Sequence, residues 1–228
     1  MIFKEAMKED MTNPVVILCG GPAPDSNAAK QIPSHDFLIA VDSGLDHARN
    51  LGLEPNLVIG DLDSISHSGL NWAKNQKIEI KQFSTNKDKS DLELALDEAK
   101  EITNSVFVVG SDIGRFDHVL GIIAALGSVA PFFTQSHALI GSSYLTFVTT
   151  NGKIYLSNGP TVSVFALGEH AHGVTLRGFK WELTNAFLPS RSTLGLSNEL
   201  VENVGEITVE SGVLVAIQTG AFSVQVPQ

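Results

Sequence analysis

The chain has 228 residues, 43% of them hydrophobic and 18% charged, and carries 25 acidic against 15 basic residues for a formal net charge of −10. This length and composition are typical of a globular protein of one long or two modest domains, and they exclude a disordered or fibrous chain. The acidic balance argues against a nucleic-acid or anionic-membrane partner and favours a metal ion or a small cationic ligand, because phosphate groups attract basic surfaces.

The amino-terminal segment does not resemble a secretion signal. Residues 1–12 carry five charges of mixed sign and contain no apolar core. No stretch of the chain approaches the 18 apolar residues of a membrane span. The single cysteine, Cys19, follows four apolar residues, so we expect a buried, unreactive thiol and no disulfide within the chain. We therefore expect a cytoplasmic protein that does not bind a membrane.

The first half of the sequence alternates apolar strands with helices. Continuous apolar runs separated by helical segments are typical of a parallel sheet covered on both faces. We predict a doubly wound, mostly parallel α/β domain over residues 1–136. Its strands are expected at residues 15–19, 37–41, 57–59, 78–83 and 106–109, and its helices at 44–51, 69–75, 91–101 and 118–129.

The second half has a different texture. Short, partly alternating strands are separated by Asn-Gly, Asn-Gly-Pro, Gly-Glu and Ser-Gly turns, and no helical pattern stands out. Such spacing is typical of an antiparallel sandwich, which we predict for residues 137–228. Its strands are expected at residues 144–148, 153–156, 162–165, 174–176, 206–209 and 213–217.

Glycine-bearing loops follow four of the predicted parallel strands. In open α/β sheets, ligands bind beyond the carboxyl ends of the strands. The loops contain Gly20-Gly21, Asp42-Ser43-Gly44, Gly60-Asp61-Leu62-Asp63-Ser64 and the segment 110–118. We expect them to form a cradle for phosphate groups and a metal ion.

Two carboxylates of this edge are separated by one residue. In an extended segment, Asp61 and Asp63 point to the same side, as shared Mg²⁺ ligation requires. The alternative is a turn in which Asp63 caps the following segment and Asp61 fixes the loop. Asp42 has a similar alternative, because an Asp between a strand and a helix is an expected N-cap.

The helix predicted at residues 91–101 begins with a capping box, Ser90-x-x-Glu93, which leaves Asp88 and Asp91 free to face the same cleft. In the last loop, the fork of Arg115 suits a phosphate, and a helix that begins near Asp117 presents free N–H groups to an anion. An Arg in a loop is also often just solvated.

Taken together, these segments resemble the thiamine pyrophosphokinase family. Residues 55–65, Pro-Asn-Leu-Val-Ile-Gly-Asp-Leu-Asp-Ser-Ile, are similar to its Pro-x-x-x-x-Gly-Asp-x-Asp-Ser-Ile segment. Residues 40–44 resemble Ala-Asp-Gly-Gly, with Val41 and Ser43 as departures, and residues 88–95 follow Asp-x-Thr/Ser-Asp-x-x-x-Ala. Residues 114–118 resemble Gly-Gly-Arg-x-Asp-His, with Ile113 in place of the first Gly.

The second half carries the same resemblance. Residues 173–183 are similar to the family's Gly-Val-x-x-x-Gly-Leu-Lys-Trp/Tyr-x-Leu segment, and residues 195–199 to its Gly-x-Ser-Asn segment. The resemblance implies that Trp181 stacks on thiamine and that Ser197, with Asn198, contacts it. Without the resemblance, Trp181 is expected in the core of the β domain.

The resemblance implies transfer of the pyrophosphoryl group of ATP to the hydroxyl of thiamine, in a homodimer whose sites lie at the subunit interface. It assigns Asp61, Asp63 and Asp91 to Mg²⁺, with Asp42 in the same catalytic cluster and Asp91 as our choice of proton acceptor. The remaining nucleotide-binding residues are expected to be Gly20, Gly21, Ser64, Asp88, Ser90, Arg115, Asp117 and His118.

Two other functions fit part of the pattern. A Mg²⁺-dependent phosphohydrolase of nucleotides or phosphosugars would use the same carboxylates but would not need Trp181 or Ser197. A non-catalytic thiamine sensor would need the β domain but not the carboxylates. His170 and His172 lie on one face of a strand and form a weaker candidate for a metal site, because no third ligand is near them in the sequence.

Overall fold

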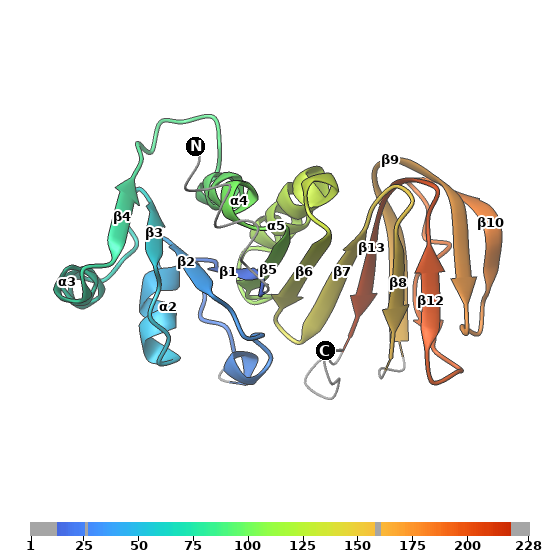
Figure 1. Ribbon diagram of the computed structural model, residues 1–228, viewed down its shortest axis with the longest axis horizontal. Coiled ribbons are helices and arrows are strands. Elements are labelled where there is room, and N and C mark those ends of the chain that lie inside the picture. Colours follow the sequence, from blue (N-terminus) through green and yellow to red (C-terminus); the bar gives the residue numbers. More distant parts are fainter. Residues whose placement is uncertain (1–12, 26, 158–160, 220–228) are drawn as a thin grey trace. The chain divides into compact units, whose positions relative to one another are not determined.

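The computed structural model describes residues 13–25, 27–157 and 161–219 (Figure 1). The amino-terminal segment 1–12 and the Asn-Gly-Pro turn at 158–160 lie outside the described residues. The chain divides into two units, residues 1–125 and 126–228. The element labels follow Figure 1.

A parallel sheet of five strands organises the first unit. Its strands lie side by side in the order β4-β3-β2-β1-β5, and every neighbouring pair is parallel. The three central strands are buried throughout or nearly so, as their apolar sequences predict. The strands are β1 (Val15–Leu18), β2 (Phe37–Val41), β3 (Leu57–Gly60), β4 (Glu79–Gln82) and β5 (Ser105–Gly110).

Helices connect these strands on both faces of the sheet. Figure 1 shows α2 and α3 on one side and α4 on the other. The helical elements are η1 (Ala28–Lys30), α2 (Gly44–Asn50), α3 (His67–Gln76), α4 (Asp91–Ile102), α5 (Phe116–Val129) and η2 (Ala130–Phe132), and the unit boundary falls within α5. No helix in the described part of the chain is long and apolar enough to cross a membrane.

The starts of two helices are fixed by their caps. Ser66 begins α3, and its hydroxyl accepts a hydrogen bond from the Gly69 N–H at 2.9 Å. The predicted capping box begins α4: the Glu93 N–H donates to Ser90 Oγ at 3.2 Å, and the Ser90 N–H donates to the Glu93 carboxylate at 2.8 Å. Each cap satisfies a backbone donor that the helix leaves unpaired.

The order of the strands predicts where a ligand binds along the carboxyl ends of the parallel strands. The chain runs outward from β1 through β2 and β3 to β4, and then crosses to the other side of β1 to form β5. The loops after β1 and β5 therefore leave the sheet in opposite directions. This is the switch point where open α/β sheets bind ligands.

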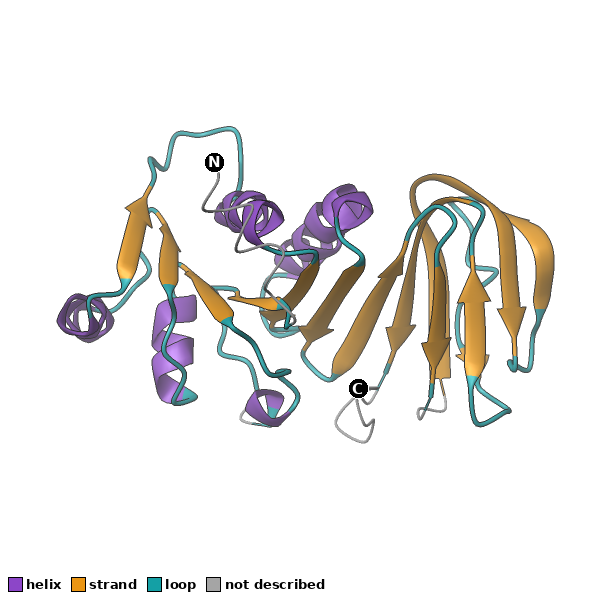
Figure 2. Ribbon diagram, viewed as in Figure 1, coloured by secondary structure: helices purple, strands orange, loops and turns teal. Residues whose placement is uncertain are grey.

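The second unit is built from antiparallel strands, and beyond η2 its described residues are strands and loops (Figure 2). One sheet contains β6, β7, β13 and the first half of β9, and the short β11 pairs with the start of β9. In the other sheet, the second half of β9 pairs with β10 and β12, and β12 pairs with β8. The strands are β6 (Gln135–Ile140), β7 (Ser143–Val148), β8 (Lys153–Leu156), β9 (Thr161–Arg177), β10 (Leu183–Leu188), β11 (Asn198–Glu199), β12 (Gly205–Thr208) and β13 (Ser211–Gln218).

The predicted fold class, an α/β domain followed by a β-sandwich, is confirmed. The predicted set of strands is wrong in two respects. Strands β6, β10 and the short β11 are not among the predicted strands, and the strands predicted at 162–165 and 174–176 are the two ends of the single strand β9. Gly168 and Gly173 have positive φ angles of 69° and 65° and allow the strand to bend from one sheet into the other. Both halves bury apolar side chains, such as Val164 and Leu176, in one core cluster.

Candidate functional site

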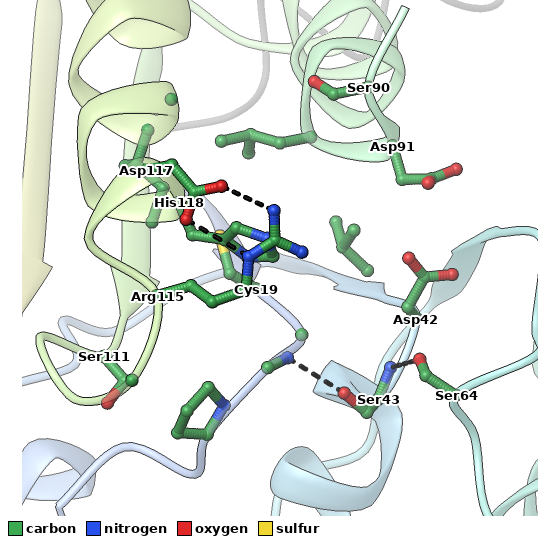
Figure 3. A pocket seen from close by; sticks show the side chains of 18 of the residues that line it. Cys19, Asp42, Ser43, Ser64, Ser90, Asp91, Ser111, Arg115, Asp117 and His118 are labelled. Carbon is green, nitrogen blue, oxygen red and sulfur yellow. Dashed lines mark hydrogen bonds and ion pairs between the residues drawn. The ribbon is translucent and has the colours of Figure 1, made fainter.

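A cavity of about 900 Å³ lies at the carboxyl edge of the parallel sheet, within the first unit (Figure 3). Loops after β1, β2, β3 and β5 line it, together with the start of α4, as the strand order predicts. Nearly all the site residues predicted in this half meet there: Gly20, Gly21, Asp42, Asp61, Asp63, Ser64, Ser90, Asp91, Arg115, Asp117 and His118. Asp88 is exposed and does not line the cavity.

Asp42 occupies a strained position immediately after β2. Its φ angle is +47°, in the left-handed region that side-chain-bearing residues rarely adopt. The residue beside it in space is Gly60, where a Cβ atom would lie 1.7 Å from Asp42 Oδ1. The N-cap interpretation is wrong, because the cap position of α2 is Ser43, and no side-chain hydrogen bond caps this helix. The backbone therefore directs the carboxylate into the cavity rather than onto the helix.

The surroundings of Asp42 disfavour its charge. Burial and then the charges of Asp91 and Asp61 raise the pKa of Asp42 from 3.8 to about 6, although a hydrogen bond from the Leu62 backbone opposes the shift. Asp42 Oδ1 is buried and has no hydrogen-bond partner. Buried carboxylate oxygens are normally satisfied, so this oxygen is available to a cation.

Asp61 and Asp63 lie on the loop after β3. The Asp63 N–H donates to Asp61 Oδ1 at 3.0 Å, so Asp61 does fix the turn, as the alternative interpretation expected. Asp63 caps no helix, because Ser66 is the N-cap of α3. A side-chain hydrogen bond between the two carboxyl groups, and then the charge of Asp61, raise the pKa of Asp63. The two carboxylates therefore stand close enough to repel each other.

Asp91 begins α4 and faces the same cavity, on the side of Asp42 (Figure 3). Its Oδ1 atom is buried and forms an ion pair with Lys87 Nζ at 3.1 Å, without hydrogen-bond geometry. Lys87 lies in the loop before α4, so the spacing rule for side-chain pairs on one helix does not predict this ion pair. Ser90 lines the cavity, but its hydroxyl is occupied by the capping box.

The donor set of this edge fits a hard cation. Carboxylate oxygens are the protein ligands that Mg²⁺ prefers. The buried, unpartnered Oδ1 of Asp42 and the mutual repulsion of its neighbours are both relieved by a positive charge. In the described ranges, no three Asp, Glu, His or Cys side chains lie close enough together to hold a metal ion by themselves, so a cation here would need further ligands such as phosphate oxygens. The residue types fit Mg²⁺.

The opposite side of the cavity carries the cationic group (Figure 3). Arg115 Nε donates to Asp117 Oδ1 at 3.2 Å, and its Nη2 atom pairs with Asp117 Oδ2. The arginine lowers the pKa of the Asp117 carboxyl. The guanidinium is 72% exposed, so its remaining N–H groups can reach a phosphate. His118 also lines the cavity, as does Ile113, which replaces the first Gly of the family segment.

The thiol of Cys19 lies at the cavity wall. Burial raises its pKa to about 12, so it stays protonated and is a poor nucleophile. This agrees with the expected unreactive cysteine.

The predicted thiamine residues lie together in the second unit. Trp181 is 54% exposed, so the expectation of a core tryptophan is wrong. Asn198 is buried and holds the backbone of Trp181 by accepting from its N–H at 3.1 Å and donating to its carbonyl at 2.7 Å. Ser197 is exposed with a φ angle of 55°. Lys180 Nζ lies 4.7 Å from the indole centroid.

His170 and His172 do lie on one face, since both rings contact Phe187. However, His170 Nδ1 accepts a hydrogen bond from the Ser190 N–H at 3.1 Å. This bond uses one lone pair and leaves the neutral ring protonated on Nε2. The pair is therefore poorly suited to bind a metal.

Comparisons with known proteins match both halves of the chain. The family model described as thiamin pyrophosphokinase, catalytic domain, matches residues 28–137, and the model described as thiamin pyrophosphokinase, vitamin B1 binding domain, matches residues 149–214. A thiamine pyrophosphokinase of Bacillus subtilis is 29% identical over 210 residues, which cover 89% of this chain and 97% of the relative.

Solved structures agree with these matches. A crystal structure of thiamine pyrophosphokinase from Bacillus subtilis has a TM-score of 0.79 at 28% identity, covering 91% of this chain and 99% of that one. A thiamin pyrophosphokinase structure from Geobacillus thermodenitrificans has a TM-score of 0.75 at 27% identity, covering 90% and 96%.

The surroundings of Asp42 predict a pH-dependent stability difference. The folded protein binds a proton at Asp42 up to about pH 6, whereas the unfolded chain releases it near 3.8, so this group lowers stability as pH rises through that window. Asp42→Asn removes this titration. Its free energy of unfolding, relative to that of the native chain, should therefore rise by about 1 to 2 kcal/mol between about pH 4 and pH 7, after discounting for partial exposure.

Urea denaturation in the presence of EDTA measures this difference. Glu101→Gln, which changes an exposed carboxylate at the end of α4, is the control and should show no such trend. The prediction would be contradicted if the difference in free energy of unfolding between Asp42→Asn and the native chain did not change with pH.

Proposed function

Because the chain belongs to the thiamin pyrophosphokinase family, we propose that it transfers the pyrophosphoryl group of ATP to the hydroxyl of thiamine, giving thiamine diphosphate and AMP. The observation that carries this proposal is the cavity at the sheet edge. It gathers Asp42, Asp61, Asp63 and Asp91 with Arg115, which are the charges that a metal-bound polyphosphate requires.

The first part of the proposal concerns the metal. Asp61, Asp63 and Asp91 would hold Mg²⁺, and Asp42 belongs to the same cluster. The ion would neutralise charge on the polyphosphate oxygens. The unpartnered buried oxygen of Asp42 supports this assignment, because it lies among carboxylates that raise its pKa.

The second part concerns the nucleotide. The glycine loop and the start of α5 line the cavity, and the amino-terminal end of a helix suits phosphate oxygens. Arg115 supplies a charged fork whose direction Asp117 fixes. We assign ATP binding to residues 1–136, through Gly20, Gly21, Ser64, Ser90, Arg115, Asp117 and His118. The same role for Asp88 stays a prediction, because Asp88 lies outside the cavity.

The chemistry requires positioning more than covalent catalysis. The thiamine oxygen attacks the β-phosphorus, the bond from that phosphorus to the oxygen bridging it to the α-phosphate breaks, and AMP leaves with the bond's electrons. The hydroxyl proton passes to a base, for which we retain Asp91. Arg115 opposes the charge that spreads over the transferred group, and the cavity aligns the attacking and leaving oxygens.

The third part concerns thiamine, which we assign to residues 137–228. The exposed indole of Trp181 offers a face on which a cationic thiazolium ring can stack, for about 0.5–2 kcal/mol. Ser197 offers an exposed hydroxyl. Asn198 is buried, so it acts by holding Trp181 rather than by touching thiamine.

We further propose a cytoplasmic homodimer in which the β domain of one subunit completes the nucleotide cleft of the other. Exposed apolar side chains support this assembly, because large apolar groups are normally withdrawn from water. They flank both predicted sites: Ile113, Phe116 and Leu120 beside Arg115 in the sequence, and Leu194 and Leu196 beside Ser197.

Product analysis tests the reaction. Purified protein incubated with thiamine, ATP and Mg²⁺ should form thiamine diphosphate and AMP in equal amounts. Asp61→Asn should lower the rate at least about 100-fold, because it removes a charge from the metal site. EDTA should abolish product. Asp112→Asn, which changes an exposed residue outside the cavity lining, is the matched control.

Other products would favour other functions. ADP or free phosphate without thiamine diphosphate would refute the transfer and support the phosphohydrolase. Thiamine binding without any turnover would support the sensor. Both alternatives have less support, because the family matches extend over both the nucleotide and the thiamine halves.

A second test addresses Trp181. Trp181→Ala should raise the KM for thiamine at least about tenfold and leave the KM for ATP within about twofold, because only the stacking face is lost. Its free energy of unfolding should fall by about 1 kcal/mol or less, since the side chain is 54% exposed. Phe179→Ala, at a 2% exposed position, should instead cost about 3–5 kcal/mol.

An unchanged KM for thiamine in Trp181→Ala would remove this residue from the site. Trp181→Phe keeps an aromatic face and should recover most of the affinity.

A further inference from the structure

The glycine loop after β1, Gly20-Gly21-Pro22, forms one wall of the cavity. Gly21 is exposed with a φ angle of +91°, and a Cβ atom added there would meet nothing within 4 Å. Side-chain packing therefore does not fix Gly21 itself. Its position has to come from the hydrogen bonds of its backbone.

Helix α2 supplies those hydrogen bonds from two positions. The Gly21 N–H donates to Ser43 Oγ at 3.0 Å, and the Gly21 carbonyl accepts from His47 Nε2 at 2.9 Å. A carbonyl can only accept, so His47 must carry a proton on Nε2. Ser43 and His47 are four residues apart, about one helical turn, and so reach the two polar backbone groups of the same residue. We name this pair the Gly21 clamp.

The Gly21 clamp also connects to the acidic loop. The Ser43 N–H donates to Ser64 Oγ at 3.2 Å, and Ser64 follows Asp63 directly (Figure 3). Gly20 permits the close approach, because a Cβ atom there would lie 3.1 Å from Ser43 Oγ. One chain of hydrogen bonds thus joins the loops after β1, β2 and β3.

The ordinary roles of these two side chains do not account for the arrangement. Ser43 stands at the N-cap of α2, yet its hydroxyl makes no capping bond. His47 is 9% exposed and does not line the cavity, so it cannot touch a substrate there. Ser43 also occupies a position where the family's Ala-Asp-Gly-Gly segment has glycine, which has no hydroxyl to offer Gly21.

We propose that Ser43 and His47 are positioning residues for ATP: by holding both polar groups of Gly21, they fix the glycine loop against the polyphosphate and set nucleotide affinity. This inference rests on the proposed function. The clamp lies in the first unit beside the residues assigned to the nucleotide, whereas the residues assigned to thiamine belong to the second unit. Its loss should therefore affect ATP and not thiamine.

Steady-state kinetics of the full chain test the proposal with a matched pair at His47. His47→Leu fills the space without a donor and should raise the KM for ATP about three- to tenfold, the effect of losing one hydrogen bond. The KM for thiamine and the kcat should stay within about twofold. His47→Gln places an amide N–H near the Nε2 position and should restore the KM for ATP.

Ser43→Ala provides an independent variant, because this small change at a half-buried site spares the fold. It should raise the KM for ATP by a similar factor. In the double variant Ser43→Ala/His47→Leu, the two effects should combine to less than their product, since both act through Gly21.

Two results would overturn the proposal: an unchanged KM for ATP in both His47→Leu and Ser43→Ala, or equal rises in the KM for ATP and for thiamine that His47→Gln does not reverse. If the native chain forms no thiamine diphosphate, the proposed function fails separately. The clamp is then judged by calorimetric dissociation constants for ATP, which should be weaker in His47→Leu than in His47→Gln. Equal constants would overturn it.

Discussion

The cavity at the carboxyl edge of the parallel sheet gathers carboxylates that repel one another, and the rest of the site depends on how the backbone holds them together. Two unit charges about 4 Å apart repel by roughly 4 kcal/mol at an effective dielectric near 20. The left-handed backbone at Asp42 and Leu62, and the missing side chain at Gly60, are what permit such an arrangement. Backbone strain that opposes stability is typical of functional sites. Burial and the neighbouring carboxylates raise the pKa of Asp42, and its Oδ1 atom has no hydrogen-bond partner, so the site is suited to a divalent cation.

The two halves of the chain are suited to different kinds of ligand because their secondary structures differ. The parallel sheet brings the ends of distant segments to one edge, which suits a ligand with several charges. The β unit instead exposes the indole of Trp181, and the buried amide of Asn198 fixes the backbone of that residue. A rigid platform of this kind loses little conformational freedom when a flat cation binds. Charge neutralisation and stacking are thus separated along the sequence, which is why substitutions in either half should affect one substrate at a time.

Much of this architecture could be predicted from the sequence, because apolar periodicity is local. The buried runs that became β1, β2, β3 and β5 are continuous, and the capping box at Ser90 marks the start of α4 unambiguously. The continuity of β9 could not be predicted, since glycines that usually end a strand here bend it. The Gly21 clamp and the Asn198 contacts could not be predicted either, because they join residues that are distant in sequence. Exposure of Trp181 runs against its hydrophobicity, and only the family resemblance indicated it.

The central claim, that the acidic cluster binds a divalent cation together with the nucleotide, can be measured directly. Mn²⁺ prefers the same oxygen ligands as Mg²⁺ and is detected by electron paramagnetic resonance. The native chain should be titrated with Mn²⁺ in the presence of α,β-methylene ATP, whose α–β linkage cannot be cleaved, and compared with Asp61→Asn. The account predicts protein-bound Mn²⁺ in the native chain and an affinity at least about tenfold weaker in the variant, since one carboxylate ligand is lost. Equal Mn²⁺ binding by the two proteins would contradict it.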